Sequence, residues 1–93
     1  MDSDIKILEH SGVCRSLIFY LAHPEGLLRI AYRKELKLSS KTAKIVHDLL
    51  YENELIENIP NKEQLLFHLT KKGVEIAEFL KKIERIIKEP IKV

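Results

Sequence analysis

The chain has 93 residues and a mass of 10.9 kDa, a length at which one domain with a single hydrophobic core is expected. Its 45% hydrophobic and 32% charged residues, with three glycines and three prolines, exclude a disordered tail, a collagen-like chain and a disulfide scaffold. No apolar run reaches the roughly 18 residues that span a bilayer, and residues 1–4 are acidic where a signal peptide is basic. We therefore expect a cytoplasmic protein with no membrane association.

The net charge of +2 is distributed unevenly along the chain. Residues 27–50 carry six basic and two acidic side chains, and residues 71–93 carry seven basic and four acidic ones. Residues 1–26 and 51–70 are net acidic. A net charge this small does not by itself indicate a nucleic-acid-binding protein, so the two basic segments must be placed on the fold before they can be interpreted.

Two helices are expected in the first part of the chain. The apolar residues of segment 13–22 recur at the spacing of one helical face, and the turn at residues 24–26 ends this helix. A shorter helix is expected over residues 30–36, where no residue before the first turn is a good N-cap.

A third helix is expected over residues 40–53. Ser39 and Ser40 stand at its start, where a serine hydroxyl accepts hydrogen bonds from the free N–H groups of the first turn. Its inner face is predicted to hold apolar residues and one core histidine, namely Ala43, Val46, His47 and Leu50. This leaves five residues directed elsewhere: Lys41, Thr42, Lys44, Ile45 and Asp48.

A β-hairpin is predicted after the third helix. Strands are expected at residues 55–59 and 64–69, because both segments are rich in apolar residues and are separated by Pro60 and Asn61. The turn is expected to occupy residues 60–63.

The last helix is predicted to run from Thr70, a good N-cap, to about Glu89, before Pro90 stops it. Such a helix is about 28 Å long at 1.5 Å per residue, which is long for so small a domain. Its apolar residues are spaced three and four apart, as in the seam between two packed helices. They are Ile76, Phe79, Leu80, Ile83, Ile86 and Ile87. We expect part of this helix to pack on a second copy of the chain and form a homodimer. The alternative is that these residues belong to the core of their own chain.

This order of elements resembles the winged helix-turn-helix fold of prokaryotic transcription regulators of the MarR and HxlR kind. Residues 33–42 (RKELKLSSKT) are similar to the K-E-L-G-L-S-x-x-T pattern of the second helix, turn and recognition-helix start. Residues 50–57 (LYENELIE) resemble the L-x-x-x-G-L-I-x run, and residues 69–73 (LTKKG) the L-T-x-K-G signature. The resemblance implies a mainly α fold with a small β-hairpin: a single winged-helix domain over residues 1–93, with its core at 13–70 and a long C-terminal helix at 70–89.

Two positions depart from these patterns. Lys37 and Glu54 stand where the family has turn glycines. Both turns must then be made by a non-glycine residue, and a left-handed backbone is expected at each.

The resemblance implies double-stranded DNA as the partner. The third helix, at about residues 40–53, would enter the major groove as the recognition helix. Basic groups around it and the wing, which is the hairpin at about residues 56–69, would contact phosphates. The residues expected at the groove are Lys41, Thr42, Lys44, Ile45 and Asp48, and Ser39 or Ser40 would approach a phosphate. The residues expected to contact the DNA backbone are Arg29, Arg33, Lys34 and, at the wing tip, Lys62. The protein would be a sequence-specific regulator that binds as a dimer, and the resemblance implies a prokaryotic source, such as an archaeon or an archaeal virus. The composition, rich in isoleucine, lysine and glutamate, favours a thermophile.

Other interpretations remain open. Lysines on a helix surface are often simply solvated, and Ile45 and Leu49 would form an outward apolar patch for a protein partner. The acidic residues 52–57 offer a second surface of that kind. A winged-helix module that binds protein and not DNA is therefore the alternative function. Whether a small-molecule effector binds between the dimer helices is not indicated by the sequence.

Catalysis and metal binding are not expected. His10 and Cys14 are four residues apart, but the chain has one cysteine and no ligand cluster, so we predict no metal and no cofactor. His68 lies on a predicted strand and, like His47, has no evident partner that would make it a general base. The sequence contains no glycine-rich phosphate loop or nucleophile elbow, and we do not expect an enzyme.

Overall fold

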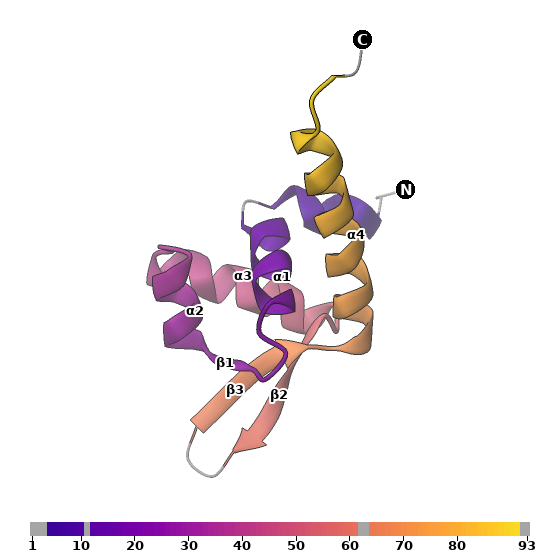
Figure 1. The fold of residues 1–93 in the computed structure, drawn as a ribbon. Helices are drawn as coiled ribbons and strands as arrows, with labels where there is room; N and C mark the ends of the chain where they lie inside the picture. Colours follow the sequence, from indigo (N-terminus) through magenta and orange to yellow (C-terminus); the bar gives the residue numbers. More distant parts are fainter. Residues whose placement is uncertain (1–3, 11, 62–63, 92–93) are drawn as a thin grey trace.

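The chain folds as a small helical core with a sheet on one side and a long helix that leaves the body of the protein (Figure 1). The computed structural model describes residues 4–10, 12–61 and 64–91. In chain order the elements are the 3-10 helix η1 (Asp4–Glu9), α1 (Val13–Leu21), β1 (Leu27–Leu28), α2 (Arg29–Glu35), α3 (Ser40–Glu52), β2 (Ile56–Asn61), β3 (Gln64–Leu69) and α4 (Lys71–Lys88). The four predicted α-helices are confirmed to within one residue at each end, whereas η1 and β1 were not predicted.

The sheet has three antiparallel strands in the order β1-β3-β2. β2 and β3 form the predicted hairpin, and β1 adds a strand on the far side of β3, where Leu27 pairs with Phe67 and Leu28 with Leu66. A two-residue strand has too few positions to show alternation in the sequence. Its pairing partner lies some 40 residues further along the chain, so the expectation of a hairpin alone is corrected to a three-stranded sheet.

β2 is longer than predicted. The sequence placed residues 60–61 in a turn, but Pro60 pairs with Leu65 and Asn61 with Gln64. Proline is tolerated here because β2 is an edge strand, where a missing N–H costs no ladder hydrogen bond on the solvent side. The wing-tip residue Lys62 lies outside the described residues.

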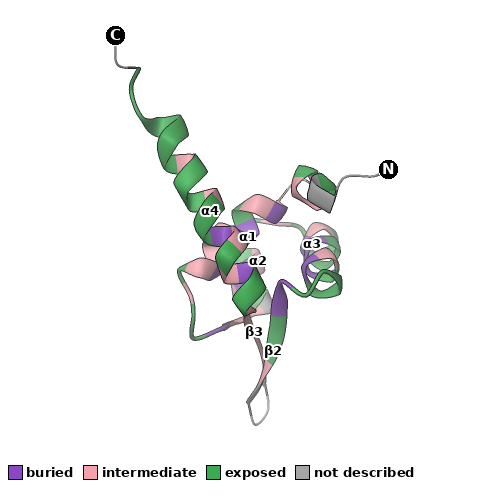
Figure 2. Ribbon diagram, turned by 90° about the vertical axis from the view of Figure 1, so that its right-hand side faces the viewer, coloured by how far each residue is buried: buried purple, intermediate pink, exposed green. Residues whose placement is uncertain are grey.

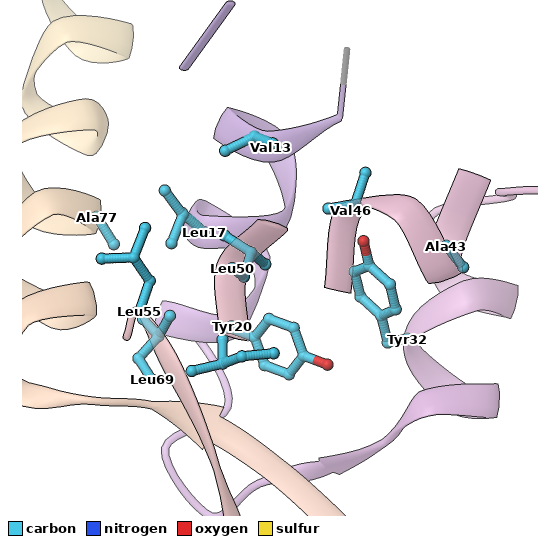
Figure 3. Packing of buried hydrophobic residues seen from close by; sticks show 11 residues of the cluster. Val13, Leu17, Tyr20, Tyr32, Ala43, Val46, Leu50, Leu55, Leu69 and Ala77 are labelled. Carbon is cyan, nitrogen blue, oxygen red and sulfur yellow. The ribbon is translucent and has the colours of Figure 1, made fainter. Parts of the chain in front are cut away.

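The core gathers around α1, which contacts α3, β3 and α4 (Figure 3). Its buried apolar residues come from every α-helix and from β2, β3 and the turn before them. They are Val13, Leu17, Tyr20, Tyr32, Ala43, Val46, Leu50, Leu55, Ile56, Leu69 and Ala77. Gly73 permits close contact between α4 and this core, since a Cβ at that position would come within 2.1 Å of the Leu55 carbonyl oxygen.

α4 divides into two parts along its length. Its first half packs on the core with the buried Gly73 and Ala77 and the half-buried Ile76 and Leu80. The second half extends past the body of the protein and is almost entirely exposed (Figure 2). The six residues predicted for dimerisation are therefore split: Ile76 and Leu80 serve the core of their own chain, and four others are more than half exposed. These four are Phe79, Ile83, Ile86 and Ile87.

The left-handed backbone predicted at two non-glycine turns is confirmed. Lys37 has φ 55° and Glu54 has φ 60°. After each of them the next leucine N–H bonds back to a carbonyl five residues earlier: Leu38 to Arg33 at 3.0 Å and Leu55 to Leu50 at 2.8 Å. This is the Schellman arrangement, which satisfies the last carbonyls of a helix and usually has glycine at the left-handed position.

Lys37→Gly is expected to stabilise the protein by about 0.5–1 kcal/mol. The left-handed conformation costs an L-residue about 1–2 kcal/mol, and the extra chain entropy of glycine cancels part of this gain. Urea unfolding followed by circular dichroism measures the change. The control is Lys81→Gly, at an exposed position inside α4, which should lose about 1 kcal/mol. Equal losses at both positions would contradict a strained turn at Lys37.

Candidate nucleic-acid interface

α3 is held in place by the residues on its inner face. Ala43, Val46, His47 and Leu50 are buried, as predicted. The His47 Nε2 atom lies 2.8 Å from the Tyr20 hydroxyl of α1, and its ring centroid lies 4.5 Å from that of Tyr32 on α2. His47 is therefore a core histidine that ties three helices together, and the opposite side of α3 faces outward.

The start of α3 is capped by Ser39. Its Oγ accepts a hydrogen bond from the Thr42 N–H at 3.1 Å and donates to the Thr42 hydroxyl at 3.0 Å. The next hydroxyl, that of Ser40, accepts a hydrogen bond from the Arg33 guanidinium of α2. The positive end of the α3 dipole and the Arg33 charge therefore lie side by side, which is the electrostatic environment that an anion such as phosphate favours.

The outer face of α3 carries both signs of charge. Lys41, Lys44 and Asp48 are exposed, and Ile45 is 41% exposed. Lys44 Nζ lies 3.0 Å from an Asp48 carboxylate oxygen, one helical turn away. With Glu52 also exposed, this face has two cations and two anions and is close to neutral.

Further basic residues border α3 on the α2 side. Lys34 and Lys37 are exposed and Arg33 is half-buried, with a shallow groove of about 360 Å³ between the two helices. Arg15 lies at the C-terminal end of α2, where its guanidinium donates a hydrogen bond to the Leu36 carbonyl at 2.6 Å. Of the other predicted contacts, Arg29 is the first residue of α2 and Thr42 is half-buried, whereas Lys62 lies outside the described residues.

The sequence reasoning missed two exposed residues beside this face. Tyr51 is 53% exposed and lines a groove of about 280 Å³ between α3 and the hairpin, together with Asp48 and Asn58. Its spacing of seven residues from Lys44 was the signal that could have placed it on the same side of α3. Ile30 is equally exposed and lines the groove toward α2.

The prediction that Ile45 and Leu49 form an outward apolar patch is wrong in part. Leu49 is half-buried and packs against the core, because the inner face of α3 is wide enough to include it. Ile45 is the member of the pair that remains exposed.

Acidic residues occupy the last position of α3 and the segment that follows it. Glu52, Glu54 and Glu57 are all exposed. Glu57 on β2 faces His68 on β3, with a carboxylate oxygen 2.9 Å from Nε2. His68, for which the sequence indicated no partner that would make it a general base, therefore does have a carboxylate partner, because strand pairing brings together residues eleven positions apart.

Neither the cysteine nor the histidines form a recognisable metal site in the described part of the chain, where no three potential ligands come together. The Cys14 thiol donates to the Leu8 carbonyl at 3.5 Å, and burial raises its pKa. Among the described helices none is long and apolar enough to cross a membrane.

Comparison with known proteins finds no matching family model and no matching curated protein. Solved structures do match. One is a Staphylococcus aureus MepR–DNA complex, with 18% identity, a TM-score of 0.77 and coverage of 90% of this chain and 63% of that one. Another is Streptococcus pneumoniae FabT in complex with DNA, with 21% identity, a TM-score of 0.69 and coverage of 88% and 62%.

A third match is AF1382 from Archaeoglobus fulgidus, with 16% identity, a TM-score of 0.77 and coverage of 95% of this chain and all of that one. This chain thus spans less than two thirds of the MepR and FabT chains and the full length of AF1382. Sequence identities this low carry the fold and not the activity. Together with the order and packing of the elements, the matches show that this chain has the winged helix-turn-helix fold with a long C-terminal helix.

Proposed function

We propose that this chain is a transcriptional regulator that binds double-stranded DNA, with α3 in the major groove and the β2–β3 hairpin as the wing on the backbone. The observation that carries the proposal is the setting of α3: its inner face is fixed by buried residues, and its start and outer face are exposed beside the basic residues of α2. The same fold is seen in MepR and FabT, both solved in complex with DNA.

In the proposed interface, one group of residues contacts phosphates and another contacts base edges. Arg33, Lys34 and Lys37 approach phosphates together with the start of α3, because this is where positive charge is concentrated. Lys41, Lys44, Ile45 and Asp48 face base edges, with Tyr51 at the wing side. Since the α3 face is itself nearly neutral, the attraction to DNA depends mainly on the residues around it.

A homodimer is part of the proposal. Phe79, Ile83, Ile86 and Ile87 leave an apolar surface on the projecting half of α4, and burying such a surface against a second copy removes it from water. A two-fold dimer places two α3 helices on half-sites about one DNA turn apart. Because both helices bind the same duplex, the dimer has a higher affinity for DNA than either chain has alone. The archaeal source is likewise a proposal.

The second candidate function is binding to another protein. The exposed acidic residues Glu52, Glu54 and Glu57 favour it, because they lie beside the proposed groove contacts and repel phosphate. The partial burial of Leu49 weakens the apolar version of this candidate.

The first test is a fluorescence-anisotropy titration with mixed-sequence duplex DNA at 50 and 200 mM salt. DNA binding through several phosphates predicts a loss of affinity of roughly 10³-fold between the two conditions, because counterions must be displaced. Absence of binding even at 50 mM salt would count against the regulator and favour the protein-binding candidate.

Ser39→Asp separates folding from DNA binding. Aspartate is as good an N-cap as serine, so the free energy of unfolding should change by less than about 0.5 kcal/mol. The added charge lies where a phosphate is proposed, so DNA affinity should fall about tenfold or more. Ser39→Asn, an equally good cap without the charge, is the control and should retain affinity. Equal binding by both variants would remove the start of α3 from the interface.

Ile83→Asp combined with Ile87→Asp is expected to give monomers, because carboxylates cannot be buried in an apolar seam without a large cost. Both side chains are exposed in the single chain, so the fold itself should survive, which circular dichroism checks. Sedimentation velocity measures the oligomeric state, and Lys81→Asp, at an exposed position of α4 beside Glu78 and Glu84, is the control. A double variant that still sediments as a dimer would exclude this surface.

A further inference from the structure

The Lys44–Asp48 pair is an unusual feature for a surface proposed to face DNA. Asp48 is exposed near the middle of the outer face of α3, where a carboxylate weakens the attraction to phosphate. Its oxygen lies 3.0 Å from Lys44 Nζ, and the two side chains are 52% and 70% exposed. The pair therefore presents a hydrogen-bond donor and an acceptor next to each other, both accessible from outside.

We infer that Lys44 and Asp48 read one base pair together and select a G·C pair in one strand orientation, with guanine facing Lys44 and cytosine facing Asp48. The inference rests on the proposed placement of α3 in the major groove. In that groove guanine presents the O6 and N7 acceptors and cytosine presents the N4 amino donor. O6 and N4 are neighbours because they are hydrogen-bonded to each other within the base pair. The ammonium of Lys44 and the carboxylate of Asp48 match this order of acceptor and donor.

The other three base pairs fit less well. A T·A pair keeps an acceptor, thymine O4, opposite Lys44 and a donor, adenine N6, opposite Asp48. It also sets the thymine methyl beside the ammonium and the adenine N7 acceptor beside the carboxylate, both of which are unfavourable. The C·G and A·T pairs reverse the two central groups, so a donor faces Lys44 and an acceptor faces Asp48. The expected order of affinity is G·C first, T·A second, and C·G and A·T last.

The two residues have opposite effects on affinity for DNA of arbitrary sequence. Without Asp48, Lys44 is free to contact any phosphate or acceptor, so binding to random DNA becomes tighter and less selective. Without Lys44, the Asp48 carboxylate is left in the groove with no neighbouring cation, so all binding becomes weaker. Asp48 in this view lowers affinity for incorrect sites, which is a common means of obtaining specificity.

The test is selection of bound sequences from a randomised duplex pool, carried out with the wild-type chain, Lys44→Ala, Asp48→Ala and Lys88→Ala. Lys88 is the matched control, since it also pairs with an acid one turn away, Glu84, but on α4. The wild type and the control should enrich a motif with a G·C pair in each half-site. Both α3 variants should lose the preference at that same position. Circular dichroism checks that all four proteins are folded.

Anisotropy titrations with four duplexes that differ only at this base pair then measure the size of the base-pair preference. The wild type should bind the G·C duplex about tenfold to a hundredfold more tightly than the C·G duplex, and Asp48→Ala should reduce this ratio to below about threefold. Asp48→Ala should also bind a scrambled duplex more tightly than the wild type does.

Three results would overturn the inference while leaving DNA binding intact: a preferred pair other than G·C, loss of preference at different positions in the two variants, or wild-type binding with no enriched motif. Failure of the wild type to bind any duplex at low salt would instead overturn the proposed function, and the inference with it.

Discussion

The rotation of α3 about its own axis is the constraint on which the rest of the surface depends. His47 fixes it through the Tyr20 hydroxyl and through ring contact with Tyr32. Tyr32 is fixed in turn by Ser16: since the Ser16 hydroxyl donates to the Gly12 carbonyl, the Tyr32 hydroxyl donates to Ser16 Oγ at 2.6 Å. Burial raises the pKa of the Tyr32 phenol, which keeps it a neutral donor. Buried hydrogen bonds tolerate less rotation of a helix about its axis than apolar contacts do. The buried residues of α3 therefore determine which of its residues face outward.

Local signals in the sequence were sufficient for most of the fold. Helix faces and the Ser39 and Thr70 caps follow from residues close together in the chain, and the left-handed backbone at Lys37 and Glu54 was implied by the resemblance. The structure agrees with all of them. The features that sequence reasoning missed depend on distant partners. β1 exists because β3 accepts it as a neighbour, and Glu57 meets His68 through strand register. Leu49 was misplaced because the width of a helix's buried face is decided by what packs against it.

The candidate site shows the same division. The i, i+4 spacing of Lys44 and Asp48 was visible in the sequence, whereas the contact between Arg33 and Ser40 joins two helices and was not. Charge is likewise organised between elements: cations gather at α2 and the start of α3, and anions at the end of α3 and the start of β2. A surface arranged in this way depends less on total charge than on orientation. In the proposed complex with DNA, attraction would come from the basic end of this surface and discrimination from the mixed charges beside it.

Pro60 has a consequence for the behaviour of the protein in concentrated solution. The hairpin leaves β2 as a free sheet edge, and an open edge is a template on which another chain can add a strand. Proline offers no N–H to such a strand, and the exposed Glu57 on the same edge places a charge where an incoming backbone would dock. Pro60 and Glu57 therefore disfavour strand addition at the β2 edge, whereas on the other side of the sheet β1 pairs with only two residues of β3.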